Sequence, residues 1–273
     1  MTEESLTFED KEIAYFLISD IDKLKSYLLK KIKGAKEDKV GNIHYVKGRG
    51  KILVTAHLDT VFSPPKKVYY SYTSDKKLKY SGEINPIGAD DRAGCWALYK
   101  HIKETDKDFY AIFTVGEETG GYGAQNAVFD KKYDFQYIVS LDRYGANNVC
   151  FYDIATEEFR RDVLALGFEE TFGGFTDACV FAERFNVCGV NVSVGYMQAH
   201  TSSEYLIVDD LKDSIYKHMK IFSLNKKYVY DYYDDIYMYG KYRKDYYDFK
   251  AYYDFWAKYD KYLGKEYRYQ EKY

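Results

Sequence analysis

The sequence predicts an α/β fold: a three-layer sandwich in which helices cover both faces of a central mixed, mostly parallel sheet. Short apolar runs bounded by turn residues alternate along the chain with segments of helical periodicity. Strands and helices that alternate in this way form largely parallel sheets that are buried on both faces. With 273 residues, 46% of them hydrophobic, the chain is long enough to bury such a core.

The N-terminal third is predicted to begin with helix and continue with strands. Apolar side chains recur near every third and fourth position of residues 1–35, which predicts helix. Apolar runs at 43–46 and 52–56 predict strands, since turn residues bound each of them. The runs 69–72 and 78–80 are expected to pair as a hairpin.

The rest of the body alternates regularly. The expected helices are 93–102, 124–129, 159–166, 177–185 and 206–222. The expected strands are 110–115, 137–141, 149–152 and 189–194. This order places the ends of several strands, and the loops that follow them, on one rim of the sheet, where ligands bind in this architecture.

Bulk charge excludes two classes of partner. The net charge of −3 and the pI near 6.0 give no reason to expect binding to nucleic acid or to an anionic membrane. The start of the chain lacks the basic and apolar regions of a secretory signal, and no run approaches the roughly 20 apolar residues of a membrane span. We therefore expect a cytoplasmic protein. Four separated cysteines without a Cys-x-x-Cys pair are expected to be buried free thiols.

Composition divides the chain near residue 225. Beyond that point Tyr, Asp, Lys and Phe dominate, so we predict a body at 1–224 and a Tyr-rich extension at 225–273. Aromatic residues at near-heptad spacing indicate a helical extension with an apolar stripe. The stripe could pack on the body, pair with a second copy or dock a protein partner. Alternatively, a skew in codon usage could enrich Tyr, Lys, Asp and Phe without any function. Balanced acidic and basic residues argue against nucleic acid.

Chemically distinctive side chains fall at the ends of predicted strands. His57 ends one strand in VTAHLDTVF, and Asp142 ends another in VSLDRYG. The adjacent Glu117 and Glu118 follow a third strand in FTVGEETGG, and Asp90 precedes a helix in IGADDRAG. His200 lies in the loop after the last strand. All of these groups are therefore expected on one rim.

Imidazoles and carboxylates in this number suit amide hydrolysis by two metal ions. Two divalent ions roughly 3.5–4 Å apart activate a shared water and polarise the carbonyl. Zinc takes imidazole and carboxylate ligands in catalytic sites, and one free carboxylate must move the proton. Asp59 lies two residues after His57, on the same strand face, where it is placed to orient the imidazole.

Each motif also has a simpler explanation. His57 alone could be a satisfied core histidine, and Glu117-Glu118 alone a solvated turn. Asp90-Asp91 alone could be a helix N-cap followed by a first-turn acid. Arg92 and Arg143 could bind a substrate carboxylate or pair with neighbouring acids. The joint occurrence of the motifs favours a metal site.

These motifs, in this order, resemble those of the co-catalytic zinc peptidases, such as peptidase T, glutamate carboxypeptidase, acetylornithine deacetylase and the bacterial leucyl aminopeptidases. The similar region is 52–210, and its last segments are GGFTDA and AHTSSEYL. The resemblance implies a zinc-dependent exopeptidase fold. Many relatives insert a lid or dimerisation domain between the residues that correspond to Asp142 and His200, which are only 58 positions apart in this chain. Other relatives insert a separate domain between the residues that correspond to His57 and Asp90, which are 33 positions apart here. The chain is therefore expected to be a catalytic core without a lid.

Position by position, the resemblance implies a role for each residue. Asp90 would bridge two ions, most simply Zn²⁺, with a cis peptide after it. His57 and Asp142 would complete one ion, and Glu118 and His200 the other. Glu117 would be the general base, and Asp59 would hold His57. Glu204 and Glu183 are expected to be surface or helix-capping residues.

The sequence thus predicts a dinuclear zinc hydrolase of peptide or amide bonds, most simply an aminopeptidase or small-peptide exopeptidase. An N-acyl amino acid deacylase is the first alternative, with an acylated amino acid as substrate. The second is a non-catalytic, metal-stabilised protein that binds partners or itself through the aromatic extension. Retention of Glu117 argues against this second alternative, because a protein that only holds metal needs no base.

Overall fold

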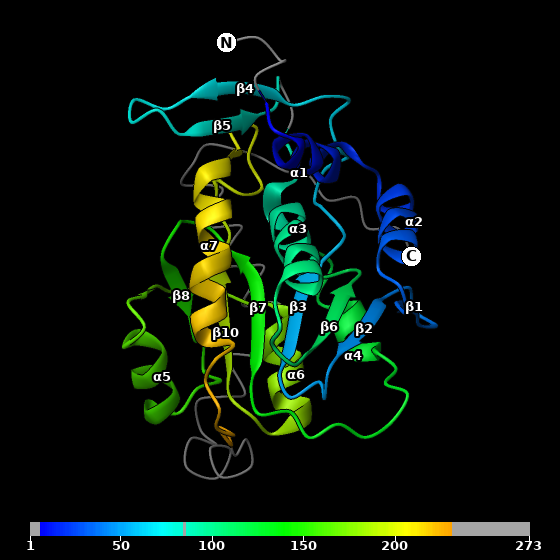
Figure 1. The fold of residues 1–273 in the computed structure, drawn as a ribbon, viewed down its shortest axis with the longest axis vertical. Helices are drawn as coiled ribbons and strands as arrows, with labels where there is room; N and C mark the ends of the chain where they lie inside the picture. The colour runs from blue at the N-terminus through cyan, green and yellow to red at the C-terminus, as the bar shows by residue number, and fades with distance from the viewer. Residues whose placement is uncertain (1–5, 84–85, 231–273) are drawn as a thin grey trace, which may run out of the picture. The chain divides into compact units, whose positions relative to one another are not determined.

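The computed structural model describes residues 6–83 and 86–230 and shows an eight-stranded mixed sheet in that part of the chain (Figure 1). The strand order is β1-β2-β6-β3-β7-β10-β8-β9. The bounds are β1 Lys36–Glu37, β2 Ile43–Lys47, β3 Leu53–His57, β6 Phe109–Thr114, β7 Ile138–Arg143, β8 Asn148–Cys150, β9 Glu169–Glu170 and β10 Gly189–Ser193. The predicted fold class is confirmed.

The centre of the sheet is parallel and fully buried. Strand β3 pairs in parallel with β6 and β7, and β7 pairs in parallel with β10. All residues of β3, β6 and β10 are buried, as expected for strands that are covered on both faces. Antiparallel pairs join β1 to β2, β2 to β6 and β8 to β10. The carboxyl ends of β3, β6, β7 and β10 consequently meet on one rim.

Helices form the two outer layers. The helices are α1 Phe8–Ile18, α2 Ile21–Lys31, α3 Ala89–Glu104, α4 Tyr122–Asn126, α5 Glu157–Leu164, α6 Asp177–Phe185 and α7 Val208–Ile221. In Figure 1, α3 and α7 lie side by side in front of the sheet, and α6 lies behind it. Both α3 and α6 pack against β3 and β7, so the central strands are enclosed between these two helices.

The predicted N-terminal helix is two helices. Thr7 and Asp10 form a reciprocal capping box at the start of α1. Asp20 then caps α2 through a bond from the Lys23 backbone N–H to its carboxylate, and the chain turns between the two helices. Residues 1–5 of the predicted helical segment lie outside the described residues.

A second, smaller sheet lies at the end of the body toward which the parallel strands of the large sheet run. Its strands run in the order β11-β12-β5-β4, all antiparallel, with bounds β4 Tyr69–Tyr72, β5 Leu78–Ser81, β11 Tyr196–Met197 and β12 Tyr205–Ile207. The expected hairpin 69–72/78–80 is confirmed. The prediction that helix begins at 206 is wrong by two positions, because β12 occupies 205–207 before α7 starts.

Other boundaries shift slightly. The helix expected at 124–129 is α4, Tyr122–Asn126, and the strand expected at 149–152 is β8, Asn148–Cys150. The two-residue strands β1, β9 and β11 were not predicted, because two residues carry no periodicity. All four cysteines are free; three are buried, and Cys179 is partly exposed.

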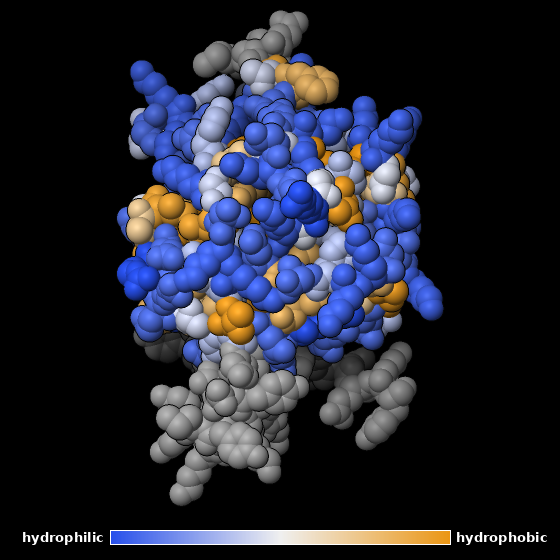
Figure 2. Space-filling model, turned by 60° about the horizontal axis from the view of Figure 1, so that its bottom comes forward, coloured by the Kyte–Doolittle hydropathy of each residue, from blue (hydrophilic) through white to orange (hydrophobic). Residues whose placement is uncertain are grey.

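Residues 225–230 belong to the body rather than to a separate helix. Tyr228 is buried between Tyr137 and Phe159, and its hydroxyl donates to Asp162. The remainder of the predicted extension, 231–273, lies outside the described residues, so its helical character stays a prediction. No helix in the described ranges is long and apolar enough to cross a membrane. Figure 2 shows one face that is largely hydrophilic, with hydrophobic side chains in small separate groups.

Candidate metal centre

His57 is the last residue of β3, where the buried run LVTAH reaches the rim. Its Nδ1–H donates to the backbone carbonyl of Asp59, 3.0 Å away, while the Asp59 carboxylate is 3.6 Å from the same nitrogen. The carbonyl therefore holds the ring more closely than the carboxylate that the sequence suggested. Burial lowers the pKa of His57, but hydrogen bonds with Asp142, Asp59 and Asp90 outweigh it and raise the pKa well above its ordinary value. Nε2 faces Asp90 and Asp142, and loss of its proton would leave it able to bind metal.

Asp90 and Asp91 precede the regular part of α3 and have non-helical backbone angles. The Asp90–Asp91 peptide is cis, as the resemblance implied. Both oxygens of Asp91 accept backbone N–H groups, from His57 at 3.1 Å and from Gly94 at 3.0 Å. Asp91 thus caps the regular part of the helix, while no backbone N–H of the described residues donates to the Asp90 carboxylate. Helix capping therefore applies to Asp91, and metal binding by Asp90 stays a prediction.

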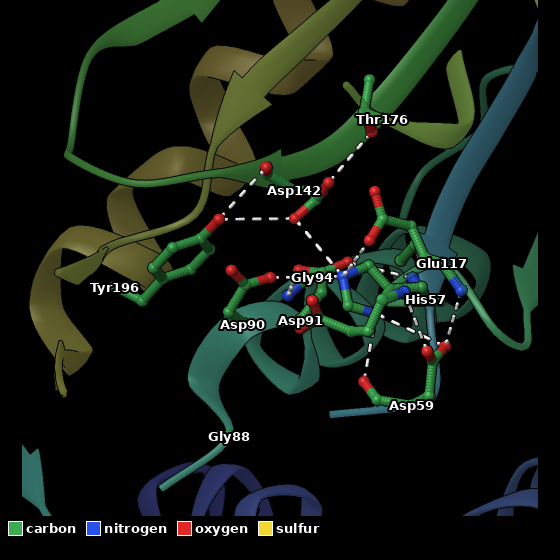
Figure 3. Close-up of polar contacts among 12 residues, drawn as sticks. His57, Asp59, Gly88, Asp90, Asp91, Gly94, Glu117, Asp142, Thr176 and Tyr196 are labelled. Carbon is green, nitrogen blue, oxygen red and sulfur yellow. Dashed lines mark hydrogen bonds and ion pairs between the residues drawn. The ribbon is translucent and has the colours of Figure 1, made fainter. Parts of the chain in front are cut away.

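Gly94 allows α3 to approach the rim. A Cβ atom at this position would lie 1.8 Å from the carbonyl oxygen of Leu141 and 2.3 Å from Asp91 Oδ1. Any other residue would push the helix away from β7. The glycine in DDRAG therefore brings Asp90 close to Asp142, as the close-up in Figure 3 shows.

Asp90 lies between the two predicted sets of ligands. Its Oδ1 is 3.2 Å from His57 Nε2, and its Oδ2 is 3.3 Å from His200 Nε2. His57 Nε2 is also 3.6 Å from Asp142 Oδ1, and His200 Nε2 is 3.0 Å from the Glu118 carboxylate. Each Asp90 oxygen thus faces one imidazole, and each imidazole has at least one further carboxylate beside it. The structure brings together all five residues predicted to hold metal.

Asp142 is held from three sides at the end of β7. Thr176 donates its hydroxyl to Oδ2 at 2.9 Å, and the Tyr196 hydroxyl lies 3.3 Å from Oδ1 (Figure 3). The Asn191 amide pairs with the Asp142 backbone on the neighbouring strand. The contact from Thr176 comes from the GGFTDA segment. Nothing in the sequence pointed to Tyr196, which arrives from β11.

The Glu117-Glu118 turn is fixed by Asp59. The two Asp59 carboxylate oxygens accept the backbone N–H groups of Glu117 and Glu118, at 3.2 and 3.0 Å. Glu118 contacts His200, whereas Glu117 Oε2 lies 3.9 Å from His57 Nε2 and has no closer partner of this kind among the described residues. Asp59 therefore connects the position of His57 to that of both glutamates.

Glu204 is buried and is not a surface residue, which corrects one of our two interpretations of it. Its carboxylate accepts the backbone N–H of Gly88 at 2.6 Å and that of Asp90 at 3.1 Å. It therefore caps the segment before α3, as the other interpretation proposed. Glu204 lies four positions after His200, so one loop carries both a predicted ligand and the group that holds Asp90. In the sequence, the AHTSSEYL segment, which carries both His200 and Glu204, was the signal that could have pointed to this role of Glu204.

The carboxylates of the site carry more negative charge than its histidine side chains balance. Burial raises the pKa of Asp142 to about 6, and the charge of Asp90 adds to this rise. Burial also raises the pKa of Glu117 well above its ordinary value. For His200, burial lowers the pKa, but hydrogen bonds with Asp90 and Glu118 outweigh it and raise the pKa to about 11. Buried carboxylates that crowd two imidazoles are the environment that divalent cations stabilise.

Two groups of ligand atoms are close enough to hold an ion: His57, Asp90 and Glu118, and His57, Asp91 and Asp142, each with its atoms within 4.8 Å. Imidazole and carboxylate donors of this kind fit zinc. Asp91 is the weaker candidate of the second group, because backbone N–H groups already occupy both its oxygens. Asp90 Oδ1 lies 3.2 Å from Nε2 of the same His57 imidazole.

Asp177 is a further buried carboxylate behind Glu117. The Thr114 hydroxyl donates to its Oδ2, while its Oδ1 is buried without a protein partner. Burial raises the pKa of Asp177 to about 7, although the bond from Thr114 opposes this rise. The GGFTDA segment thus supplies Thr176 to Asp142 and Asp177 to the layer beneath the glutamate turn.

Neither arginine next to a predicted ligand forms an ion pair with a described acid. Arg92 is buried and donates to the carbonyl of Ser19 at 2.9 Å. Arg143 donates to the Thr171 hydroxyl and to the carbonyl of Phe172. The ion-pair interpretation of both residues is therefore wrong, and Arg92 is too buried to meet a substrate carboxylate.

Comparison with known proteins agrees with this geometry. Residues 69–153 match the model of the M42 glutamyl aminopeptidase family. That segment contains Asp90, Glu117, Glu118 and Asp142 but neither His57 nor His200. A protein of Acetivibrio thermocellus named "Putative aminopeptidase" is 42% identical over 59 residues, which are 20% of this chain and 18% of that protein. The chain thus spans less than a fifth of the length of this curated relative.

Solved structures share the fold over most of the chain. A tripeptidase from Staphylococcus aureus has a TM-score of 0.63 at 15% identity and covers 79% of this chain and 97% of its own. Aminopeptidase PepT from Bacillus cereus has a TM-score of 0.61 at 16% sequence identity, and the match covers 78% of this chain and 97% of that chain. The Pyrococcus horikoshii TET1 peptidase has a TM-score of 0.53 at 18% identity, and the match covers 75% of this chain and 94% of that chain. At these identities the likeness concerns the fold, and the family match is confined to residues 69–153.

Proposed function

We propose that this chain is a dinuclear zinc-dependent aminopeptidase that removes the N-terminal residue from small peptides. The single observation that carries the proposal is the position of Asp90, with one oxygen 3.2 Å from His57 and the other 3.3 Å from His200. A carboxylate shared by two imidazole-carboxylate pairs is the arrangement that a two-ion site requires. The match to the M42 glutamyl aminopeptidases supports the peptide substrate.

Each ion would have its own residues in addition to Asp90. His57 and Asp142 would hold one ion, and Glu118 and His200 the other. The bond from the His57 Nδ1–H to the Asp59 carbonyl supports this assignment, because it leaves Nε2 free to bind. The His200 side chain is 49% exposed, so the second position is the one open to solvent and to substrate.

The protein's own groups account for proton transfer. Two divalent ions bound there would lower the pKa of a shared water and polarise the scissile carbonyl. Glu117, which has no close polar partner on its carboxylate among the described residues, would take a proton from the attacking water and return it to the leaving amine. Asp59 would position Glu117 through its bond with the Glu117 backbone N–H. Burial favours the protonated form that donates in the second step.

The Pyrococcus relative is described as assembling into a tetrahedron or an octahedral shell. Self-association of this chain, through its aromatic extension, remains a proposal that sedimentation of the full chain would test.

A substrate panel tests the proposed function. The zinc-loaded protein should release p-nitroaniline from aminoacyl-anilides and cleave dipeptides, and a strong chelator should stop both reactions. Hydrolysis of N-acetyl amino acids with none of the anilides would instead identify a deacylase. Tight binding of two zinc ions without hydrolysis of any compound in the panel would favour the metal-stabilised binding protein.

A further inference from the structure

Several exposed hydrophobic side chains lie on segments that follow the predicted site residues. Of the eleven large hydrophobic residues exposed in the described part of the chain, four follow a predicted site residue by two to four positions, and the backbone carbonyl of a fifth accepts a hydrogen bond from Arg143, next to Asp142. They are Val61, Phe62, Tyr122, Tyr144 and Phe172. We call these five residues the apolar rim. Exposed apolar groups concentrated around a polar site commonly mark a binding surface.

One side of the rim borders the open end of the metal centre. Val61 and Phe62 line a small hollow together with Pro86, and the same hollow is lined by Asp90 and His200. The Thr60 hydroxyl donates to the Phe62 carbonyl at 2.6 Å, and this bond fixes the turn that presents both side chains. Apolar and metal-binding groups therefore face the same space.

Local packing leaves little freedom to this turn. Gly88 has a φ of +65°, and a Cβ atom there would lie 2.8 Å from the Thr60 methyl group. The loop after β3 and the segment before α3 are thus in direct contact. The hollow has a volume of about 10 Å³, which is room for about one water molecule. A substrate side chain would consequently lie across the exposed faces of Val61 and Phe62 rather than in a deep slot.

Another part of the rim is organised by Arg143. Its guanidinium carbon lies 3.9 Å from the centre of the Tyr144 ring, and the group donates to the Phe172 carbonyl. This cation lies beside Asp142 but is already bound to the Thr171 hydroxyl as well. Arg143 therefore stacks on the Tyr144 ring and fixes the Phe172 backbone through one of its five N–H groups.

Charge around the hollow disfavours acidic substrates further. Asp90, Glu117, Glu118 and Asp142 surround the imidazoles, and Glu204 lines the hollow itself. Two divalent ions would offset most of this charge but would leave no surplus positive charge for a substrate carboxylate. An apolar side chain meets no such penalty and removes the rim from water.

We propose that the apolar rim binds the side chain of the peptide's N-terminal residue, so that the substrates are peptides beginning with a large apolar residue. This inference rests on the proposed aminopeptidase function. Because the hollow is shallow, discrimination should be at the lower end of what hydrophobic sites achieve, about tenfold.

Equilibrium binding separates this inference from the proposed function. Zinc-loaded Glu117→Gln protein would be titrated calorimetrically with Leu-Gly, Phe-Gly, Glu-Gly and Lys-Gly. We expect Leu-Gly and Phe-Gly to bind about tenfold more tightly than the charged dipeptides. Equal affinities, or tighter binding of Glu-Gly or Lys-Gly, would overturn the inference. This result does not depend on turnover, so it stands whether or not the wild-type protein hydrolyses peptides.

Rim variants locate the effect. In the same zinc-loaded background, Phe62→Ala should weaken Leu-Gly binding several-fold while leaving Ala-Gly binding nearly unchanged. Tyr216→Ala is the matched control, since Tyr216 is exposed on α7 outside the rim. Identical Leu-Gly affinities of the Phe62 and Tyr216 variants would contradict the inference. Bound zinc, measured in every variant, shows that the metal centre itself is intact.

Discussion

Asp90 and Glu204 are joined at the point where the chain enters α3: the Glu204 carboxylate accepts the Asp90 backbone N–H at 3.1 Å and that of Gly88 at 2.6 Å. Glu204 belongs to the loop that also carries His200. The carboxylate proposed to bridge two ions and one imidazole proposed to bind an ion therefore share a support, although 110 positions separate Asp90 from His200. Rearrangement of this loop would disturb both predicted ion positions together.

Replacing Glu204 by alanine should weaken metal binding without removing a ligand. Two backbone donors would lose their buried acceptor, and Asp90 would lose its fixed orientation. We expect zinc affinity to fall about 10–100-fold, measured by competition with a chelating dye. Glu183→Ala is the matched control, because Glu183 is exposed on α6. Equal zinc affinity in the two variants would show that Glu204 has no supporting role.

Replacing Asp90 by alanine should abolish binding of both ions, because each of its oxygens faces a different imidazole. Elemental analysis of the purified variant provides the measurement. Asp213→Asn, an exposed acid on α7, should retain the wild-type metal content. A variant lacking Asp90 that still binds one ion tightly would limit this residue to a single site.

Glu117 and Glu118 should respond differently to the same change. Glu117→Gln should retain metal and lower kcat about 10²–10⁴-fold, since only the proton carrier is lost. Glu118→Gln should lose metal affinity, because Glu118 contacts His200 at 3.0 Å. Parallel measurements of zinc content and anilide hydrolysis distinguish the two outcomes. Unaltered turnover in Glu117→Gln would remove Glu117 from the mechanism.

The buried pair His101 and His218 should make stability depend on pH. His218 Nε2 donates to the Ser193 carbonyl, and its Nδ1 faces His101 Nε2 at 3.1 Å. Burial lowers the pKa of His218 to about 4 and that of His101 well below its ordinary value. The unfolded chain therefore binds more protons, so this stabilisation is complete above about pH 6.5 and is lost as the pH falls toward 4.

The variant His218→Gln can keep both hydrogen bonds but does not titrate. Its urea midpoint should change less between pH 7 and pH 5 than the wild-type midpoint does, by about 1–2 kcal/mol in unfolding free energy. Tyr216→Phe, on the same helix and exposed, serves as the control. A pH dependence in His218→Gln as steep as that of the wild type would assign the effect to the acidic groups.

Two truncations test the boundary of the body. Ending the chain after residue 230 should leave metal content unchanged, because every predicted ligand lies between His57 and His200. Ending it after residue 224 removes buried Tyr228 and should lower stability by about 3 kcal/mol, by analogy with removal of buried aromatic side chains. Loss of metal from the chain that ends at residue 230 would show that residues 231–273 contribute to the site.

The sequence was sufficient where local pattern and strand order decide the position of a residue. His57, Glu118 and Asp142 end, or closely follow, buried strands, and parallel pairing of β6, β3 and β7 brings such ends together. The contacts of Tyr196 and Glu204 were not predictable in the same way. They depend on how loops fold back over the rim, and loop conformation leaves no periodic signal in the sequence.

Local propensity also misplaced the boundary between a strand and the helix that follows it. Residues 206 and 207 fit the apolar spacing of the helix that follows, yet they pair with β5 as part of β12. Tertiary pairing decides their conformation, because a strand partner is available at Tyr80 and Lys79. Similarly, the supposed surface glutamate at 204 is buried, because the unpaired N–H groups before α3 require an acceptor.

Five side chains from separate segments are proposed to hold a pair of cations. The most direct measurement is the zinc content of the purified full chain after equilibration with zinc and removal of excess metal. We expect about two equivalents per chain, with anilide hydrolysis rising as the ions are added back to chelated protein. Full hydrolytic activity in protein stripped of metal, or no retained zinc at all, would contradict the account.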